Sequence, residues 1–187
     1  MRIFHPCLTA ALAALLAFQA LPAVADGNEY TGDELAADIV TAALPLGAFA
    51  IAHYKDDGAG EGQFFRVNAA NLVLNTALRV AFNETEYGER PNGNQYAFPS
   101  GHVGFVVTQA AFLQQRFGWK YGVPAYLLSG YVAWVRVDTD HHHWRDVVFA
   151  VALSETMARL FVTPHDAVTL APIVGPEWLG LRIGRSF

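Results

Sequence analysis

The sequence predicts an all-α protein, a compact bundle of about five to six helices. Apolar segments of helical length alternate with short breaks that carry glycine, proline or charged residues. These segments are longer than ordinary strands, which favours helices even though β-branched residues occur throughout. The 187 residues are 53% hydrophobic and 16% charged, which suits one apolar domain rather than two.

The first 25 residues are typical of an export signal. Arg2 gives a basic start, Leu8–Leu21 is an apolar run, and the small residues Ala23–Ala25 precede the polar Asp26. We expect cleavage after Ala25, and an uncleaved anchor helix is the alternative. In both cases the domain is exported. It is then either periplasmic or held at the inner membrane with its site facing the periplasm.

A polar linker, residues 26–33, leads into a predicted helical domain over residues 34–166. Its helices end at the polar turn Lys55–Gly58, at Gly118 and before Pro164. Each segment is near or below the roughly 20 apolar residues that a membrane-spanning helix needs. Soluble and membrane-embedded bundles both remain open at this stage. The predicted helices are Glu34–His53, Phe64–Phe82, Gly101–Phe117, Val123–Val137 and Trp144–Val162.

The second predicted helix carries a row of polar residues. Asn68, Asn71, Asn75 and Arg79 recur at three- and four-residue steps, so they share one face of the helix. The tail, residues 167–187, is rich in glycine and proline and predicts either a short hairpin or a loose extension. No function is assigned to this tail.

Composition and charge exclude several classes of chemistry. The formal net charge is −5, so no sequence-wide basic field exists to hold a nucleic acid. The single cysteine, Cys7, lies in the predicted signal, which removes disulfides, thiolate-bound zinc and thiol nucleophiles from the mature protein. Chemistry must therefore come from His, Asp, Glu, Arg or Ser.

Three short patches carry residues suited to phosphate chemistry. The first is the loop Arg90–Gly93 and the second is Phe98–His102, where Ser100 is a good N-cap for the third helix. Helix N-termini bind anions through free backbone N–H groups, and Gly101 allows an oxyanion to approach the backbone closely. The third is Arg136–Asp146, in which His142 and Asp146 are four residues apart. If the last helix starts early enough to include His142, the two share one face and the carboxylate can hold an imidazole N–H.

In this order the patches resemble the type-two phosphatidic acid phosphatase superfamily, which includes bacterial acid phosphatases and vanadium haloperoxidases. Arg90-Pro91 matches the end of its first motif, and Pro99-Ser100-Gly101-His102 matches its second in full. The spacing of Arg136, His142 and Asp146 matches that of the family's third motif. The resemblance covers about residues 79–150 by motif and implies the helical fold of those enzymes.

The chain departs from the family pattern at two positions. Val135 stands where the family usually has serine, a change that we expect to be tolerated. Asn83 occupies the register of a family lysine. Arg79 lies about one helical turn earlier on the polar face, so our hypothesis is that Arg79 supplies the missing cation, and the alternative is an arginine that snorkels on the bundle surface.

The resemblance implies a metal-free phosphatase without a cofactor. His142 attacks phosphorus as a neutral imidazole, Asp146 fixes its tautomer, and His102 is the general acid and base. The two histidines need opposite protonation states, which predicts a bell-shaped pH profile centred on the acid side of neutral. The residues expected to bind the phosphate oxygens are Arg79, Arg90, Ser100, Gly101 and Arg136.

The substrate is expected to be a phosphorylated membrane lipid or a small phosphate ester, with membrane association in the first case. The alternatives are a soluble nonspecific acid phosphatase, a vanadate-dependent haloperoxidase and a degenerate binding protein. A metal-binding module built on residues 138–143 is a further rival, although consecutive histidines rarely converge on one ion. Tyr96, Phe98 and Trp144 line a substrate path or belong to the core. The sequence does not indicate an oligomeric state.

Overall fold

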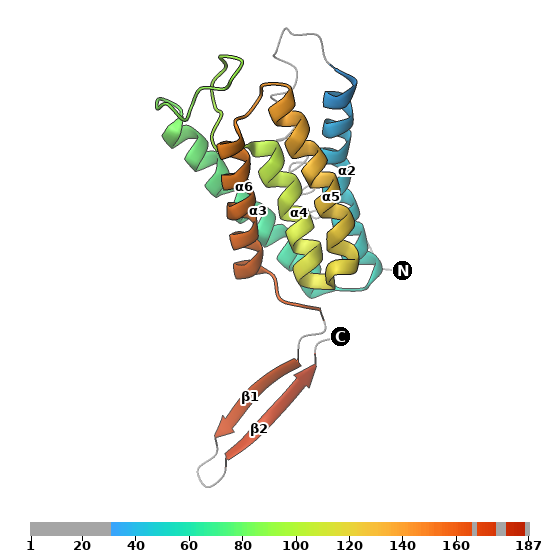
Figure 1. Cartoon of the computed structure of the whole chain (residues 1–187). Coiled ribbons are helices and arrows are strands. Elements are labelled where there is room, and N and C mark those ends of the chain that lie inside the picture. Colours follow the sequence, from blue (N-terminus) through green and yellow to red (C-terminus); the bar gives the residue numbers. More distant parts are fainter. Residues whose placement is uncertain (1–30, 166–167, 175–178, 186–187) are drawn as a thin grey trace, which may run out of the picture.

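Five helices form the body of the protein in the computed structural model, which describes residues 31–165, 168–174 and 179–185. The predicted all-α bundle is confirmed, and α4 lies at its centre because it packs against all four other helices (Figure 1). The predicted export signal lies outside the described residues. The helices are α2 (Gly32–Tyr54), α3 (Gly58–Phe82), α4 (Gly101–Phe117), α5 (Trp119–Asp138) and α6 (Trp144–Phe161).

The helix starts differ from the predicted ones because the residues that begin α2, α3 and α5 lie before the apolar segments. α2 begins two residues early because Thr31 and Glu34 form a reciprocal capping box. α3 begins at Gly58, six residues before Phe64, because the Asp57 carboxylate accepts a hydrogen bond from the Gly60 N–H at 2.9 Å. α5 begins at Trp119 because Gly118, with φ of 84°, turns the chain directly from α4 into α5.

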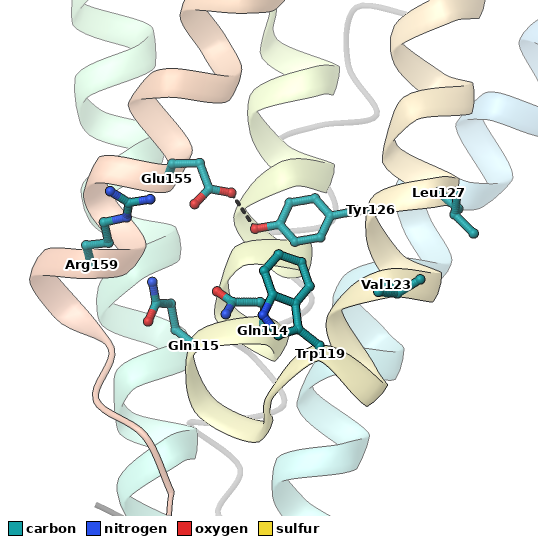
Figure 2. A pocket seen from close by; sticks show the side chains of 8 residues that line it. All are labelled: Gln114, Gln115, Trp119, Val123, Tyr126, Leu127, Glu155 and Arg159. Carbon is teal, nitrogen blue, oxygen red and sulfur yellow. Dashed lines mark hydrogen bonds between the residues drawn. The ribbon is translucent and has the colours of Figure 1, made fainter.

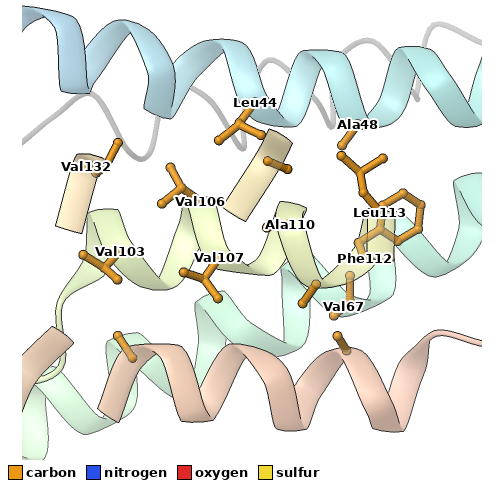
Figure 3. Close-up of a cluster of buried hydrophobic side chains, with 14 of the residues drawn as sticks. Leu44, Ala48, Val67, Val103, Val106, Val107, Ala110, Phe112, Leu113 and Val132 are labelled. Carbon is orange, nitrogen blue, oxygen red and sulfur yellow. The ribbon is translucent and has the colours of Figure 1, made fainter. Parts of the chain in front are cut away.

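The apolar core surrounds α4. Figure 3 shows Leu44 and Ala48 of α2 pointing toward Val106 and Leu113 of α4. On α3, the ring of Phe64 meets the Phe112 ring edge-on, with 5.5 Å between their centroids. Many of the buried residues are alanine and valine, so the helices approach closely around α4.

A buried polar row joins α3 to α4 and α6, which confirms that the asparagines share one face. Asn68 accepts a hydrogen bond from Gln109 at 2.6 Å, and Asn71 donates to Ser154 at 2.7 Å. Asn75 donates to the backbone oxygen of Ser100 at 3.4 Å. Because polar groups buried without partners are costly, this row specifies how α3 docks and where the first turn of α4 lies.

A buried ion pair closes the other end of the bundle. Arg116 of α4 binds Asp57 through two hydrogen bonds, of 2.6 and 2.5 Å, and it also donates to the carbonyl oxygen of Thr163 at 2.8 Å. Both side chains are less than 5% exposed. Burial raises the pKa of Asp57, but Arg116 and the Gly60 N–H outweigh it, so the pKa lies below its ordinary value.

We expect Arg116→Met to lower the free energy of unfolding by about 3 kcal/mol, because the Asp57 charge would remain buried without its guanidinium. Urea denaturation followed by circular dichroism measures this change. Arg66→Met is the matched control, since Arg66 is exposed on α3 and its replacement should cost no more than about 0.5 kcal/mol. Equal stability of the two variants would contradict a structural role for the ion pair.

The chain ends in a two-stranded antiparallel hairpin, as one of the two alternatives for the tail predicted. β1 (Val168–Val174) pairs with β2 (Leu179–Arg185), with Val168 opposite Arg185 and Val174 opposite Leu179. The hairpin extends away from the bundle, beyond the end of α6 (Figure 1). It therefore lies far from the ends of the helices that carry the sequence motifs.

Candidate active site

The three motifs meet at one end of the bundle. The start of α4 carries Ser100 and His102, the last turn of α5 carries Arg136, and the α5–α6 turn carries His142. These segments lie at the upper end of the bundle in Figure 1. The charges of Arg79, Arg90 and Arg136 all act on the His102 ring. The predicted site residues thus lie within electrostatic range of one another.

Backbone hydrogen bonds fix the loops that carry the site. The backbone oxygen of Arg136 accepts from the N–H of His142 at 2.9 Å, which ties the turn to the end of α5. The Asn92 N–H donates to the backbone oxygen of Asp140 at 3.2 Å, so the loop with Arg90 is attached to the same turn. The Ser100 N–H donates to the backbone oxygen of Asp146 at 3.3 Å and links the second motif to the third.

The His142 ring is buried and oriented by a backbone carbonyl. Its Nδ1 lies 2.8 Å from the oxygen of Ala97, and a carbonyl oxygen only accepts hydrogen bonds, so Nδ1 carries the proton. The lone pair of the neutral ring is then on Nε2. The sequence predicts Asp146 in this role, but in the structure its Oδ2 is 3.7 Å from Nδ1. Nothing in the sequence marks the Ala97 carbonyl, because every residue has one.

The environment of His142 keeps its ring neutral. Burial lowers the pKa of His142 to about 4, with Arg90 and Arg79 acting in the same direction and Asp146 opposing them. A neutral imidazole is the nucleophilic form. The resemblance implies this protonation state, and burial together with the neighbouring charges is a physical reason for it.

Asp146 is a buried carboxylate at the start of α6. Its Oδ2 accepts a hydrogen bond from the His143 N–H at 2.8 Å, while its Oδ1 has no hydrogen-bond partner among the described residues. Burial raises the pKa of Asp146, but the His142 ring and the His143 N–H lower it more, so the net shift is downward. Asp146 is therefore a fixed negative charge behind His142.

His102 is in the first turn of α4, and its side chain is 17% exposed. Burial and the charge of Arg136 hold the pKa of His102 well below its ordinary value. A general acid must be protonated, so the role expected of His102 requires an additional negative charge at the site. A bound phosphate group carries such a charge.

Arg79, rather than Asn83, lies beside Gly101 at the start of α4. A Cβ placed on Gly101 would be 3.1 Å from Nη1 of Arg79. Arg79 Nη2 also donates to the backbone oxygen of Tyr96 at 3.2 Å. The Asn83 side chain is used within its own loop, where it accepts from the Tyr96 N–H at 3.0 Å and donates to Glu84 at 2.9 Å. The geometry thus favours Arg79 as the third cation.

Several polar atoms of the site are buried without a hydrogen-bond partner within the described part of the chain. They are Ser100 Oγ, Arg79 Nε and Arg136 Nε. Ser100 holds the predicted N-cap position of α4, but its hydroxyl makes no capping hydrogen bond. Buried donors without partners are rare in proteins, and they cluster at functional sites. Ser100 stands at the start of α4, where the sequence predicts an anion, and Arg79 lies beside Gly101 there.

The three consecutive histidines face different partners. His141 Nδ1 lies 3.0 Å from the Thr139 backbone oxygen, His142 turns to Ala97, and the His143 side chain is 39% exposed. Within residues 31–165, no group of three or more His, Cys, Asp or Glu side chains is arranged to hold a metal ion. Geometry gives no support to the metal-binding alternative.

The aromatic residues beside the motifs have separate roles. Phe98 is buried and packs against Phe149, with 4.6 Å between the ring centroids, so it belongs to the core. Tyr96 and Trp144 are 45% and 57% exposed, so they do not belong to the core. The core alternative thus holds for Phe98 only.

A cavity of about 550 Å³ lies at the opposite end of the bundle. Its walls come from the end of α4, the start of α5 and the end of α6, and the Tyr126 hydroxyl donates to Glu155 on one side (Figure 2). None of the three motifs contributes to it. The lining residues are Gln114, Gln115, Trp119, Val123, Tyr126, Leu127, Glu155 and Arg159.

Comparison with known proteins agrees with the motifs. The chain is 29% identical to a lipid A 1-phosphatase of Helicobacter pylori strain ATCC 700392 / 26695 over 131 residues, which cover 67% of the chain and 65% of that protein. A lipid A 1-phosphatase of strain J99 is 28% identical over 129 residues, covering 68% and 66%. The chain thus spans slightly less than two thirds of these relatives. No solved structure shows a significant match.

The family comparison covers the site itself. The family model of the PAP2 superfamily matches residues 70–169, just over half of the chain, and this range contains all three motifs. The match includes Arg79, which precedes the first motif, and it ends beyond α6. The motifs, the helical bundle and this match together show that the chain belongs to the PAP2 superfamily.

Proposed function

We propose that the protein is a metal-independent phosphatase that hydrolyses a phosphate monoester or pyrophosphate of a membrane lipid. The observation that carries this proposal is the buried, neutral His142, whose Nδ1 faces the Ala97 carbonyl while the charges of Arg79 and Arg90 act on its ring. A nucleophile surrounded by guanidinium groups suits phosphoryl transfer, because these groups stabilise the charge on the phosphate oxygens.

The reaction proceeds in two displacements. In the first, Nε2 of His142 forms a bond to phosphorus, the bond to the leaving oxygen breaks, and His102 gives that oxygen a proton. In the second, His102 takes a proton from water, the hydroxide attacks phosphorus, and the P–N bond breaks to release inorganic phosphate. Asp146 stabilises the positive charge that develops on His142. Arg79, Arg90 and Arg136 bind the phosphate oxygens.

The lipid substrate is supported by the relatives, which are named lipid A 1-phosphatases, and by the surface of the bundle. α2 is long and apolar enough to cross a membrane, and 33% of its apolar window is buried inside the bundle. We infer that the exported protein associates with a membrane through this apolar surface. The large apolar side chains exposed on α2 and α5 are Leu35, Ile39, Leu46, Tyr54, Trp119, Val123, Leu127, Leu128 and Trp134.

The proposed function is tested by phosphate release in the presence of EDTA. The substrates are p-nitrophenyl phosphate, short-chain phosphatidic acid and lipid A, each with purified wild-type protein. We expect EDTA-resistant hydrolysis with the lipids preferred, and an acid-labile, base-stable phosphoenzyme in rapid-quench samples. Preference for p-nitrophenyl phosphate would indicate a soluble-type acid phosphatase, and bromide oxidation by the vanadate-loaded protein would indicate a haloperoxidase. Hydrolysis that EDTA abolishes would contradict the proposal.

The pH profile follows from the two shifted histidines. Protonation of His142 removes its lone pair, so kcat/KM should fall as the pH drops below about 4. His102 must be protonated to act as the acid, and its pKa is depressed in the free site. kcat/KM should therefore also fall as the pH rises, with this basic limb on the acid side of neutral. Bound phosphate favours protonated His102, so the basic limb of kcat should lie at higher pH than that of kcat/KM. Initial rates with p-nitrophenyl phosphate from pH 3 to 9 measure both limbs, and a flat profile would contradict these roles.

A further inference from the structure

Asp38 lies at the edge of the proposed phosphate site, although the motifs do not include it. From α2, its Oδ1 pairs with Nη2 of Arg136 and lies 3.5 Å from Nε2 of His102. The Asp38 side chain is 22% exposed, whereas that of Arg136 is only 5% exposed. A single carboxylate oxygen therefore contacts both a cation of the site and the proposed general acid.

A phosphate ester needs the same two contacts. In the proposed mechanism, Arg136 binds a phosphate oxygen and His102 protonates the leaving oxygen. The Asp38 carboxylate and a phosphate group at this position would repel each other. Nη2 of Arg136 also cannot donate its full hydrogen-bonding capacity to both at once. Since Asp38 is partly exposed at the edge of the site, its side chain has room to rotate toward solvent when a phosphate group enters.

We propose that the Asp38 carboxylate competes with phosphate groups for Arg136 and His102, and so lowers the affinity of the site for phosphate. The inference rests on the proposed function, because it requires a phosphate site at these residues. Competition lowers the affinity for every phosphate group alike, and only a ligand with further contacts offsets the loss. Inorganic phosphate has no such contacts. A lipid has them in its apolar part, and Leu35, one turn before Asp38, is 53% exposed.

The test measures binding of two probes, inorganic phosphate and orthovanadate, by isothermal titration calorimetry with the full-length protein. Asp38→Asn removes the competing charge with little change in shape, and we expect about tenfold tighter binding of both probes. Asp38→Glu keeps the carboxylate and should bind within about threefold of wild type. Asp33→Asn is the matched control, because Asp33 is on the same helix but contacts Tyr131 at 3.0 Å and should leave the Kd unchanged.

Each outcome decides between the alternatives. Equal Kd values for Asp38→Asn and wild type would overturn the proposal. Weaker binding by Asp38→Asn would overturn it as well, since Asp38 would then hold Arg136 in place for the phosphate. If the wild type binds neither probe and hydrolyses no ester, the proposed function itself fails. If it binds them and Asp38→Asn shows no gain, only the role of Asp38 fails.

Discussion

Replacing His142 with alanine should lower kcat by at least about 10⁴-fold and leave no phosphoenzyme to trap. His142 is the one ring of the histidine triplet whose Nδ1 faces the Ala97 carbonyl, which leaves Nε2 for attack. Its removal deletes the nucleophile, whereas the arginines that bind the phosphate stay in place. Steady-state hydrolysis of p-nitrophenyl phosphate with EDTA measures the loss.

The control for His142→Ala is His143→Ala. The His143 side chain is 39% exposed, with its Nδ1 3.5 Å from Asp146 Oδ2, and alanine retains the backbone N–H that donates to the same oxygen. We expect kcat within about threefold of wild type, as for an exposed residue outside the reacting groups. Circular dichroism and the melting temperature should show that both variants fold. Comparable loss in the two variants would assign the nucleophile to a different residue.

Candidate site residues could be identified from the sequence when they belong to a short, local pattern. Ser100 and Gly101 directly precede an apolar helix, so local geometry places them at its N-terminus. His142 and Asp146 are only four residues apart, although α6 begins between them at Trp144. Gly118 also ends α4 at the predicted residue. Local signals of this kind need no knowledge of the tertiary structure.

Two contributions to the site could not be predicted because they depend on tertiary packing. Asp38 is 98 residues from Arg136 in the sequence, and the two meet only because α2 packs beside α5. Ala97 orients His142 through a backbone oxygen across 45 residues, and a carbonyl has no sequence signature. The early start of α3 does have a local signal, because Asp57 in the polar turn before the helix is its N-cap.

Replacing Arg79 with alanine should lower kcat/KM by about 10²- to 10³-fold, the usual cost of losing one group that stabilises transition-state charge. The reason is the position of its guanidinium beside Gly101, because the register of the family lysine is occupied by Asn83 and supplies no cation. Asn83→Ala should remain within about threefold of wild type, since Asn83 hydrogen-bonds within its own loop and not at the site. The same p-nitrophenyl phosphate assay compares both variants.

Arg79→Lys separates the charge from the shape of this side chain. An ammonium keeps the positive charge but lacks the planar fork that serves Tyr96 and the site together, so we expect activity between those of Arg79→Ala and the wild type. A purely structural role, in which Arg79 only anchors the Tyr96 loop, predicts a lowered melting temperature in both variants and equal kcat/KM for Arg79→Lys and Arg79→Ala. Full activity of Arg79→Ala would show that the bundle works without this cation, and that Arg90 and Arg136 suffice to bind the phosphate.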